Sequence, residues 1–163
     1  FILATLHRAE NTDSPERLQS IIAALEEIAR EMPVVIPIHP RTRKKLQELN
    51  FNFKQTRLQL VDPVGYLEMV YLLKHCSLVA TDSGGLQKEA YFFKKYCITL
   101  RTETEWVELV EQGANIITGW RYEDILNSYK QLKHTTKDVF SSPLYGDGQA
   151  GHIIIRELQR IDS

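Results

Sequence analysis

Short apolar runs alternate along the chain with longer segments whose apolar residues recur every three or four positions. The runs predict buried strands and the periodic segments predict amphipathic helices. Strands are predicted at Phe1–Leu6, Val34–Ile38, Leu58–Val61, Leu78–Ala80, Tyr96–Leu100 and Asn115–Thr118. Helices are predicted at Pro15–Glu31, Arg41–Leu49, Tyr66–Lys74, Leu86–Phe93, Glu105–Val110, Tyr122–Leu132 and Ala150–Arg160.

The helix that begins at Pro15 has the clearest signals. Asp13 or Ser14 is its predicted N-cap, and proline suits the first helical turn. One apolar stripe follows it, made of Leu18, Ile21, Ile22, Leu25, Ile28 and Ala29. Pro33 marks where this helix has ended.

Alternating strands and helices predict an α/β fold, an open parallel sheet with helices on both faces. A chain of 163 residues that is 43% hydrophobic supports one sizeable core, so residues 1–163 are expected to form a single domain. Ligands of such sheets lie beyond the carboxyl ends of the strands. That edge should gather His7, His39, the Pro63–Gly65 turn, Ser83 and Arg101.

The run Thr81–Gly85, Thr-Asp-Ser-Gly-Gly, joins a predicted strand to a predicted helix. The first N–H groups of a helix lack internal partners and lie at its positive end, and glycine leaves them open to an anion such as phosphate. Glu89 lies one helical turn further on, within reach of hydroxyl groups on the same ligand. The alternative is a simple packing turn with Glu89 as a solvated carboxylate.

The composition gives no support to several classes of function. A net charge of −1 gives no field that would attract nucleic acid or an acidic membrane, and the basic run at 41–45 is typical of a solvated helix face. Cys76 and Cys97 lack metal-type spacing and suit reduced thiols in a cytoplasmic protein. No apolar stretch approaches the ~20 residues of a membrane span. The chain begins at Phe1 inside a strand-like run, so we expect a piece of a longer protein.

Six blocks of residues occur together in a recognisable order. They are His7–Asn11, His39-Pro40, Asp62-Pro63 followed by Tyr66-Leu67, Thr81–Ala90, Leu100-Arg101 with Thr104-Glu105, and Tyr145–Ala150. In sequence and spacing they resemble the non-hydrolysing UDP-N-acetylglucosamine 2-epimerases across essentially the whole chain. The resemblance implies a Rossmann-like domain of the two-domain GT-B architecture. It further implies the C-terminal, UDP-binding half, with the N-terminal half absent from this chain.

The resemblance also assigns roles. Ser83, Gly84 and Gly85 match the backbone cradle for the diphosphate, and Glu89 matches the carboxylate that binds the ribose hydroxyls. His7 matches the histidine near the leaving phosphate, where an imidazole can stabilise the charge that develops on departing UDP.

Two further assignments concern positions where the chain departs from the family. Met69 falls in the uracil-lining segment, at a position that is often aromatic, so stacking would become a softer thioether contact. Trp106 stands where many members have an arginine that meets phosphate, and Arg101 is expected to carry part of that charge. Trp106 and Ala9 resemble the branch that includes epimerases of 2,3-diacetamido uronic acid derivatives, so the sugar stays open between UDP-GlcNAc and such a derivative.

The implied reaction removes the C2 proton with anti elimination of UDP and then adds UDP back to the inverted carbon, interconverting UDP-GlcNAc and UDP-ManNAc or their modified counterparts. The family's carboxylates for this step come from the other half, so this chain is expected to bind nucleotide without epimerising alone. No cofactor and no metal are implied. An apolar stripe with Ile154, Leu158 and Ile161 predicts self-association, and we expect the full-length protein to be a homo-oligomer.

Two other functions stay open. The first is the donor-binding domain of a GT-B glycosyltransferase, which also holds UDP through a glycine-rich turn and a carboxylate. The second is a non-catalytic UDP-sugar-binding module. Transfer to an acceptor without C2 proton exchange would favour the former, and deuterium uptake at C2 would exclude the latter.

Overall fold

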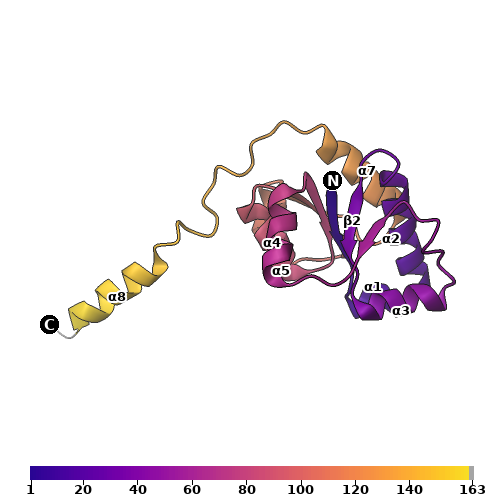
Figure 1. Cartoon of the computed structure of the whole chain (residues 1–163). Helices are drawn as coiled ribbons and strands as arrows, with labels where there is room; N and C mark the ends of the chain where they lie inside the picture. The colour runs from indigo at the N-terminus through magenta and orange to yellow at the C-terminus, as the bar shows by residue number, and fades with distance from the viewer. Residues whose placement is uncertain (162–163) are drawn as a thin grey trace.

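The computed structural model describes residues 1–161 and shows a six-stranded sheet with helices on both faces (Figure 1). The strands are β1 (Ile2–Thr5), β2 (Val34–Pro37), β3 (Gln59–Val61), β4 (Leu78–Thr81), β5 (Tyr96–Thr99) and β6 (Asn115–Ile117). Their order is β3-β2-β1-β4-β5-β6, and all neighbouring strands are parallel. The predicted open parallel sheet is confirmed.

All of the predicted helices are present, with small differences at their ends. The helices are α1 (Ala9–Thr12), α2 (Pro15–Ile28), α3 (Pro40–Glu48), α4 (Tyr66–His75), α5 (Gly84–Phe92), α6 (Val107–Glu111), α7 (Tyr122–Lys133) and α8 (Ala150–Ile161). Ser14 is the N-cap of α2, because its hydroxyl accepts a hydrogen bond from the Arg17 N–H. The sequence did not predict α1, which is one turn long and too short to show a helical period.

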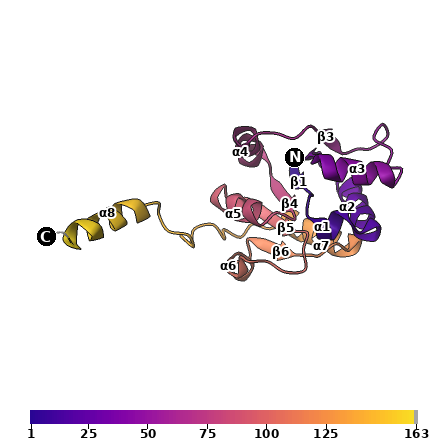
Figure 2. The same ribbon diagram turned by 90° about the horizontal axis from the view of Figure 1, so that it is seen from below.

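The two faces of the sheet are covered by different helices, as Figures 1 and 2 show. Ile2 and Ala4 of β1 belong to a cluster with residues of α2, α3 and α7. Leu3, between them in sequence, points to the other face and packs with α4 and α5. This alternation is the period of two expected of a strand, and both faces of β1 are fully buried.

The last helix, α8, lies apart from the α/β body at the end of an extended segment (Figures 1 and 2). Ile154 and Leu158 on the predicted apolar stripe are 58% and 57% exposed. The side chain of Ile161 lies outside the described part of the structure. Self-association through this stripe stays a prediction. Within residues 1–161, no helix has the length and apolar character that crossing a bilayer requires.

The direction of chain winding reverses between β1 and β4, and this positions the functional edge. From β1 the sheet grows through β2 to β3, whereas from β4 it grows in the other direction through β5 to β6. At such a switch point the loops that follow the two central strands turn away from one another and leave a crevice beyond the strand ends. The loops after β1 and β4 carry the His7 block and the Ser-Gly-Gly turn.

Candidate functional site

A cavity of about 320 Å³ opens at this switch point. His7 after β1, His39 after β2 and Val64 after β3 line it together with Ser83, Gly85 and Glu89 from the β4–α5 segment. Met69 of α4 contributes a further part of the wall. Four of the five loops that the sequence predicted at this edge therefore contribute residues to one hollow, and the loop after β5, which carries Arg101, does not.

The start of α5 forms one side of the cavity. Ser83 caps the helix through its hydroxyl, which accepts from the Leu86 N–H at 3.4 Å, and its own N–H donates to the Thr81 hydroxyl at 2.9 Å. The N–H groups of Gly84 and Gly85 belong to the first turn, which has no partners inside the helix. A methyl group added to Gly85 would meet nothing within 4 Å, so the approach to this turn is open. The geometry suits a bound anion.

Glu89 and Met69 lie further along the same cavity. Both side chains are partly buried and both line it. Glu89 is one helical turn beyond Gly85, so a ligand anchored at the turn can present hydroxyl groups to this carboxylate. Met69 lines the cavity together with Pro63 and Val64, and these three side chains give it an apolar part.

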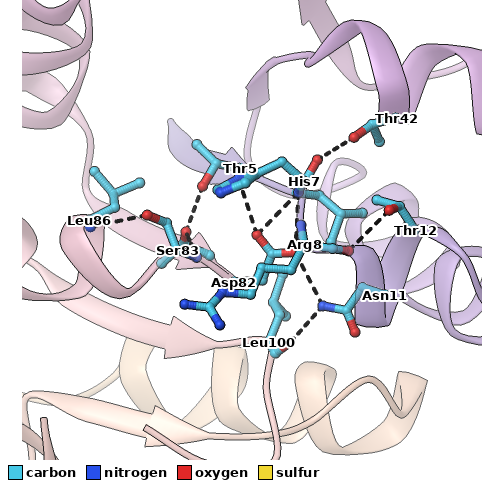
Figure 3. Close-up of polar contacts among 12 residues, drawn as sticks. Thr5, His7, Arg8, Asn11, Thr12, Thr42, Asp82, Ser83, Leu86 and Leu100 are labelled. Atoms are coloured by element: carbon cyan, nitrogen blue, oxygen red, sulfur yellow. Dashed lines mark hydrogen bonds and ion pairs between the residues drawn. The ribbon is translucent and has the colours of Figure 1, made fainter. Parts of the chain in front are cut away.

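The sequence did not predict the part that Asp82 plays in the site. Its carboxylate is fully buried and accepts hydrogen bonds from the N–H groups of His7, at 3.2 Å, and Arg8, at 3.0 Å. The Asn11 amide donates to it at 3.2 Å and also donates to the Leu100 carbonyl. Figure 3 shows these contacts converging on the turn after β1. Asp82 therefore ties the His7 turn to the strand that carries the Ser-Gly-Gly segment.

The His7 side chain lies at the mouth of this arrangement. It is 44% exposed, and its Nδ1 atom is 3.4 Å from Oδ1 of Asp82. The ring of His39 lies across from it, with the two ring centroids 6.5 Å apart. The His7 ring therefore faces the cavity, and Asp82 holds the His7 backbone through its N–H group.

The structure places Arg101 differently from its expected role in the cavity. Arg101 is only 7% exposed, and its Nη1 atom donates to Glu105 at 2.7 Å. This hydrogen bond lowers the pKa of Glu105 to about 2 and raises that of Arg101. In the described structure neither Arg101 nor Gly84 lines the cavity. A phosphate contact by Arg101 stays a prediction, and it would require Glu105 to share its partner.

Arg8 is a cation beside the start of α5, and the sequence did not predict a role for it. One of its Nη atoms is 3.7 Å from the position of a methyl group on Gly84, and the side chain is 39% exposed. It also lies 3.6 Å from Glu105. The available signal was its place in the His7–Asn11 block. Its positive charge adds to that of the helix terminus, and Glu105, whose Oε2 atom is 3.3 Å from the same methyl position on Gly84, offsets part of it.

Trp106 also contacts the start of α5. Its indole N–H donates to the Gly84 carbonyl at 2.8 Å, and the Lys88 ammonium lies 4.7 Å from its ring centroid. Trp106, where the family resemblance led us to expect an arginine, therefore acts as a packing residue. No group of three or more histidine, cysteine, aspartate or glutamate side chains within residues 1–161 is arranged to hold a metal ion.

Comparison with known proteins connects this site to a family. Residues 1–159 match the family described as UDP-N-acetylglucosamine 2-epimerase. The chain is 52% identical over 163 residues to the UDP-2,3-diacetamido-2,3-dideoxy-D-glucuronate 2-epimerase of Pseudomonas aeruginosa, a match that covers 99% of this chain and 45% of that protein. It is 40% identical over 163 residues to the UDP-N-acetylglucosamine 2-epimerase of Methanocaldococcus jannaschii, covering 97% of this chain and 44% of that protein.

Solved structures of members of this family have the same fold as this chain. The M. jannaschii enzyme in complex with UDP-GlcNAc and UDP superposes with a TM-score of 0.86 at 39% identity, covering 98% of this chain and 45% of that one. The Neisseria meningitidis enzyme bound to UDP-GlcNAc gives a TM-score of 0.81 at 32% identity, covering 98% and 44%. The chain thus spans less than half the length of the relatives that it matches. On the sequence match and the shared fold, it belongs to the UDP-N-acetylglucosamine 2-epimerase family.

Proposed function

We propose that this chain is the UDP-binding domain of a UDP-sugar 2-epimerase, a single domain that supplies the nucleotide site of a longer enzyme. The observation that carries the proposal is the shared cavity, in which the open start of α5 and the Glu89 carboxylate lie one helical turn apart. This pairing suits a diphosphate joined to a ribose. Membership of the epimerase family supports this function over a glycosyltransferase or a simple binding module.

In the proposed complex the diphosphate lies against the N–H groups of Gly84 and Gly85, next to the Ser83 cap. Glu89 accepts hydrogen bonds from the ribose hydroxyls. The uracil then extends toward the apolar part of the cavity, to which Met69 contributes. Because a thioether gives little base discrimination, uracil selectivity would depend on backbone hydrogen bonds of the neighbouring turn.

The proposed reaction is removal of the C2 proton with anti elimination of UDP, followed by addition of UDP to the inverted carbon. His7 lies where it can stabilise the negative charge that grows on the departing diphosphate. The step also requires acid and base groups on both faces of the sugar. Among the described residues, Glu89 is the single carboxylate in the cavity lining, and it is assigned to the ribose. The chain by itself should therefore bind UDP without catalysing epimerisation.

The substrate is a UDP-linked 2-acetamido sugar. The name of the P. aeruginosa relative and its 52% identity support a 2,3-diacetamido uronic acid derivative. The structures of the M. jannaschii and N. meningitidis relatives contain UDP-GlcNAc, which supports the plain sugar. Both share the nucleotide that this cavity is proposed to bind, and they differ in groups that lie beyond the diphosphate.

Isothermal titration calorimetry of the chain with UDP tests the binding proposal, with ADP as the competing base. We expect saturable UDP binding that Glu89→Ala weakens by roughly tenfold or more, since a hydrogen bond to a charged group contributes about 1.5–3 kcal/mol. Glu123→Ala, an exposed glutamate in the first turn of α7, is the matched control and should bind like the wild type. Equal affinity for ADP, or a Glu89→Ala variant that binds normally, would refute the assignment.

The reaction is tested with the full-length protein in heavy water. Incorporation of deuterium at C2 of a UDP-sugar, monitored by proton NMR, would be expected of a 2-epimerase. Transfer of the sugar to an acceptor with no exchange at C2 would instead identify a glycosyltransferase. The 163-residue chain alone serves as the negative control.

A further inference from the structure

The fully buried carboxylate of Asp82 is not explained by nucleotide binding. It does not line the cavity, and it lies at the end of β4 directly before the Ser83 cap. A buried carboxylate loses its hydration and is tolerated only where donors replace it. The identity of those donors shows what Asp82 holds in place.

The two carboxylate oxygens share the His7 N–H and otherwise have different partners. Oδ2 accepts from the backbone N–H groups of His7 and Arg8 and from the Asn11 amide. Oδ1 accepts from the His7 N–H at 3.2 Å and is also 3.4 Å from Nδ1 of the same residue. The carboxylate thus contacts both the backbone and the ring of His7 (Figure 3). Together these contacts fix the turn and place the carboxylate beside one nitrogen of the imidazole.

We propose that Asp82 is the positioning residue of His7: the carboxylate keeps a proton on Nδ1 and thereby presents Nε2 to the phosphate of the bound UDP-sugar. A carboxylate accepts and cannot donate, so a ring nitrogen that hydrogen-bonds to it must be the protonated one. Nε2 then faces the bound phosphate, and once a proton from solvent has added to Nε2 the imidazolium donates to a phosphate oxygen. The 3.4 Å contact is expected to shorten in that complex, because such hydrogen bonds tighten when the ligand binds.

This inference rests on the proposed function only for the identity of the ligand at Nε2. The tautomer is inferred from the contacts of the unliganded chain alone. The segment Thr81–Ser83, which contains Asp82, also positions the anion site. The Thr81 hydroxyl accepts a hydrogen bond from the Ser83 N–H and contacts the Thr5 hydroxyl on β1, and these contacts hold the residue that caps α5. One short segment therefore orients both the helix start that holds the diphosphate and the imidazole beside it.

The charged surroundings of His7 come from several elements. Asp82 faces it from the end of β4, His39 from the loop after β2, and Arg8 is its neighbour in the turn. Glu89 lies in the same cavity on α5. Of these groups, Asp82 is the acceptor recorded within 4 Å of Nδ1. The position of the ring proton should therefore depend on Asp82 more than on the other three.

NMR of the ¹⁵N-labelled chain tests the inference without any ligand. Long-range ¹⁵N–¹H correlation spectra distinguish the two neutral tautomers and the imidazolium form of each histidine, and loss of one set of signals in His7→Gln assigns His7. At a pH where the ring is neutral, we expect the Nδ1–H tautomer, with Nε2 unprotonated. A ring that is predominantly Nε2–H in the folded wild-type chain would overturn the proposal, and this outcome needs no variant of Asp82.

Two variants separate positioning from a merely structural role. Asp82→Asn should shift His7 toward the Nε2–H form, because an amide at this site can offer its N–H groups to the ring. Asn11→Ala removes one donor to Asp82 but leaves the His7 contact, so it should lower the thermal midpoint while the Nδ1–H tautomer persists. A tautomer that changes equally in both variants would show that Asp82 acts only by stabilising the turn.

Kinetics of the full-length protein provide the functional readout. If Asp82 acts through His7, Asp82→Asn should lower kcat by roughly 10- to 100-fold, a part of the 10²–10⁴ typical of a proton-donating group, with KM changed less. Adding Asp82→Asn to His7→Gln should then cause little further loss. Full additivity would overturn the coupling. Failure of UDP binding in the wild type, by contrast, would refute the proposed function and leave the tautomer result standing.

Discussion

The indole N–H of Trp106 donates a hydrogen bond of 2.8 Å to the carbonyl oxygen of Gly84, the first residue of α5. The same ring lies against the Lys88 ammonium and packs edge-on to Tyr145, with ring centroids 5.9 Å apart. A residue from the loop before α6 therefore fixes the helix start that is proposed to bind the diphosphate. Trp106 acts here by support of the backbone, whereas an arginine would act by its charge.

Replacing Trp106 with phenylalanine should reveal this support. Phe keeps an aromatic face for Lys88 but cannot donate to Gly84, so we expect a loss of about 1 kcal/mol in the free energy of unfolding. UDP affinity should fall severalfold, because the first turn of α5 is less well fixed. Urea unfolding and calorimetry measure the two effects. Trp120→Phe, at the other tryptophan, is the control that should change stability without changing UDP affinity.

Gly85→Ala should separate folding from binding. The added methyl group meets no atom within 4 Å, and Gly85 is a helical residue without positive φ, so alanine should stabilise the fold by about 0.5–1 kcal/mol. The same methyl group projects where the diphosphate is proposed to lie. UDP affinity should therefore fall by about tenfold or more, since overpacking costs about 1–3 kcal/mol.

Gly151→Ala is the matched control for that experiment. Gly151 is the second residue of α8, as Gly85 is of α5, and its added methyl group also meets nothing within 4 Å. Because α8 lies apart from the α/β body, the gain from helix propensity should appear as a higher helicity of α8, while UDP affinity stays unchanged. Unimpaired UDP binding by Gly85→Ala would place the diphosphate elsewhere.

The sequence predicted those features that follow from periodicity and from the ends of strands. The six strands alternate with helices, so the parallel sheet and the grouping of His7, His39 and Ser83 at one edge could be inferred before the structure. The hydrophobic pattern predicts which face of each helix or strand is buried. The rule that ligands bind at the point where the strand order reverses then predicts where the site lies.

Features that depend on buried polar contacts could not be inferred in the same way. Asp82 bonds chiefly to backbone N–H groups, which every residue type possesses, so no side-chain pattern marks its partners. Arg101 follows a strand like the other site residues, but its pairing with Glu105 draws it away from the cavity. Which arginine faces the ligand depends on side-chain packing that a linear motif does not contain.

The pairing of Glu105 with Arg101 should give the stability a pH dependence. The hydrogen bond from Arg101 lowers the pKa of Glu105 to about 2 from 4.5. A lowered pKa stabilises the fold above pH 4.5, and this contribution is lost as the pH falls through about 2. Because Glu105 is 52% exposed, solvent screening reduces the effect, and Glu105→Gln should cost only about 1 kcal/mol at pH 7.

The measurement is urea unfolding of wild type and Glu105→Gln between pH 7 and pH 2. The difference between the two should be constant above about pH 5 and should shrink as the pH approaches 2. Glu111→Gln at the end of α6, an exposed position, should differ from the wild type by less than about 0.5 kcal/mol throughout. A difference for Glu105→Gln that does not depend on pH would show that the ion pair contributes nothing in solution.

The two cysteines should be inert in the folded protein. Burial raises the pKa of Cys97 to about 12 and also raises that of Cys76, so both thiols stay protonated and shielded at pH 8. Labelling with a thiol-reactive disulfide reagent should then proceed only through opening of the fold, and both thiols should react at once in denaturant. Rapid labelling of either thiol in the native chain would contradict the packing around β4 and β5.

The raised pKa of Cys97 also predicts how stability changes in alkali. The unfolded chain releases the thiol proton near pH 9 whereas the folded chain keeps it, so the unfolding free energy should fall as the pH rises from 9 toward 12. One such thiol contributes a slope of about 1.4 kcal/mol per pH unit. Cys97→Ala should lack this share of the slope although it is less stable at pH 7, because the substitution leaves a small cavity. Parallel pH profiles of the two proteins would mean that the Cys97 thiol ionises as readily in the fold as outside it.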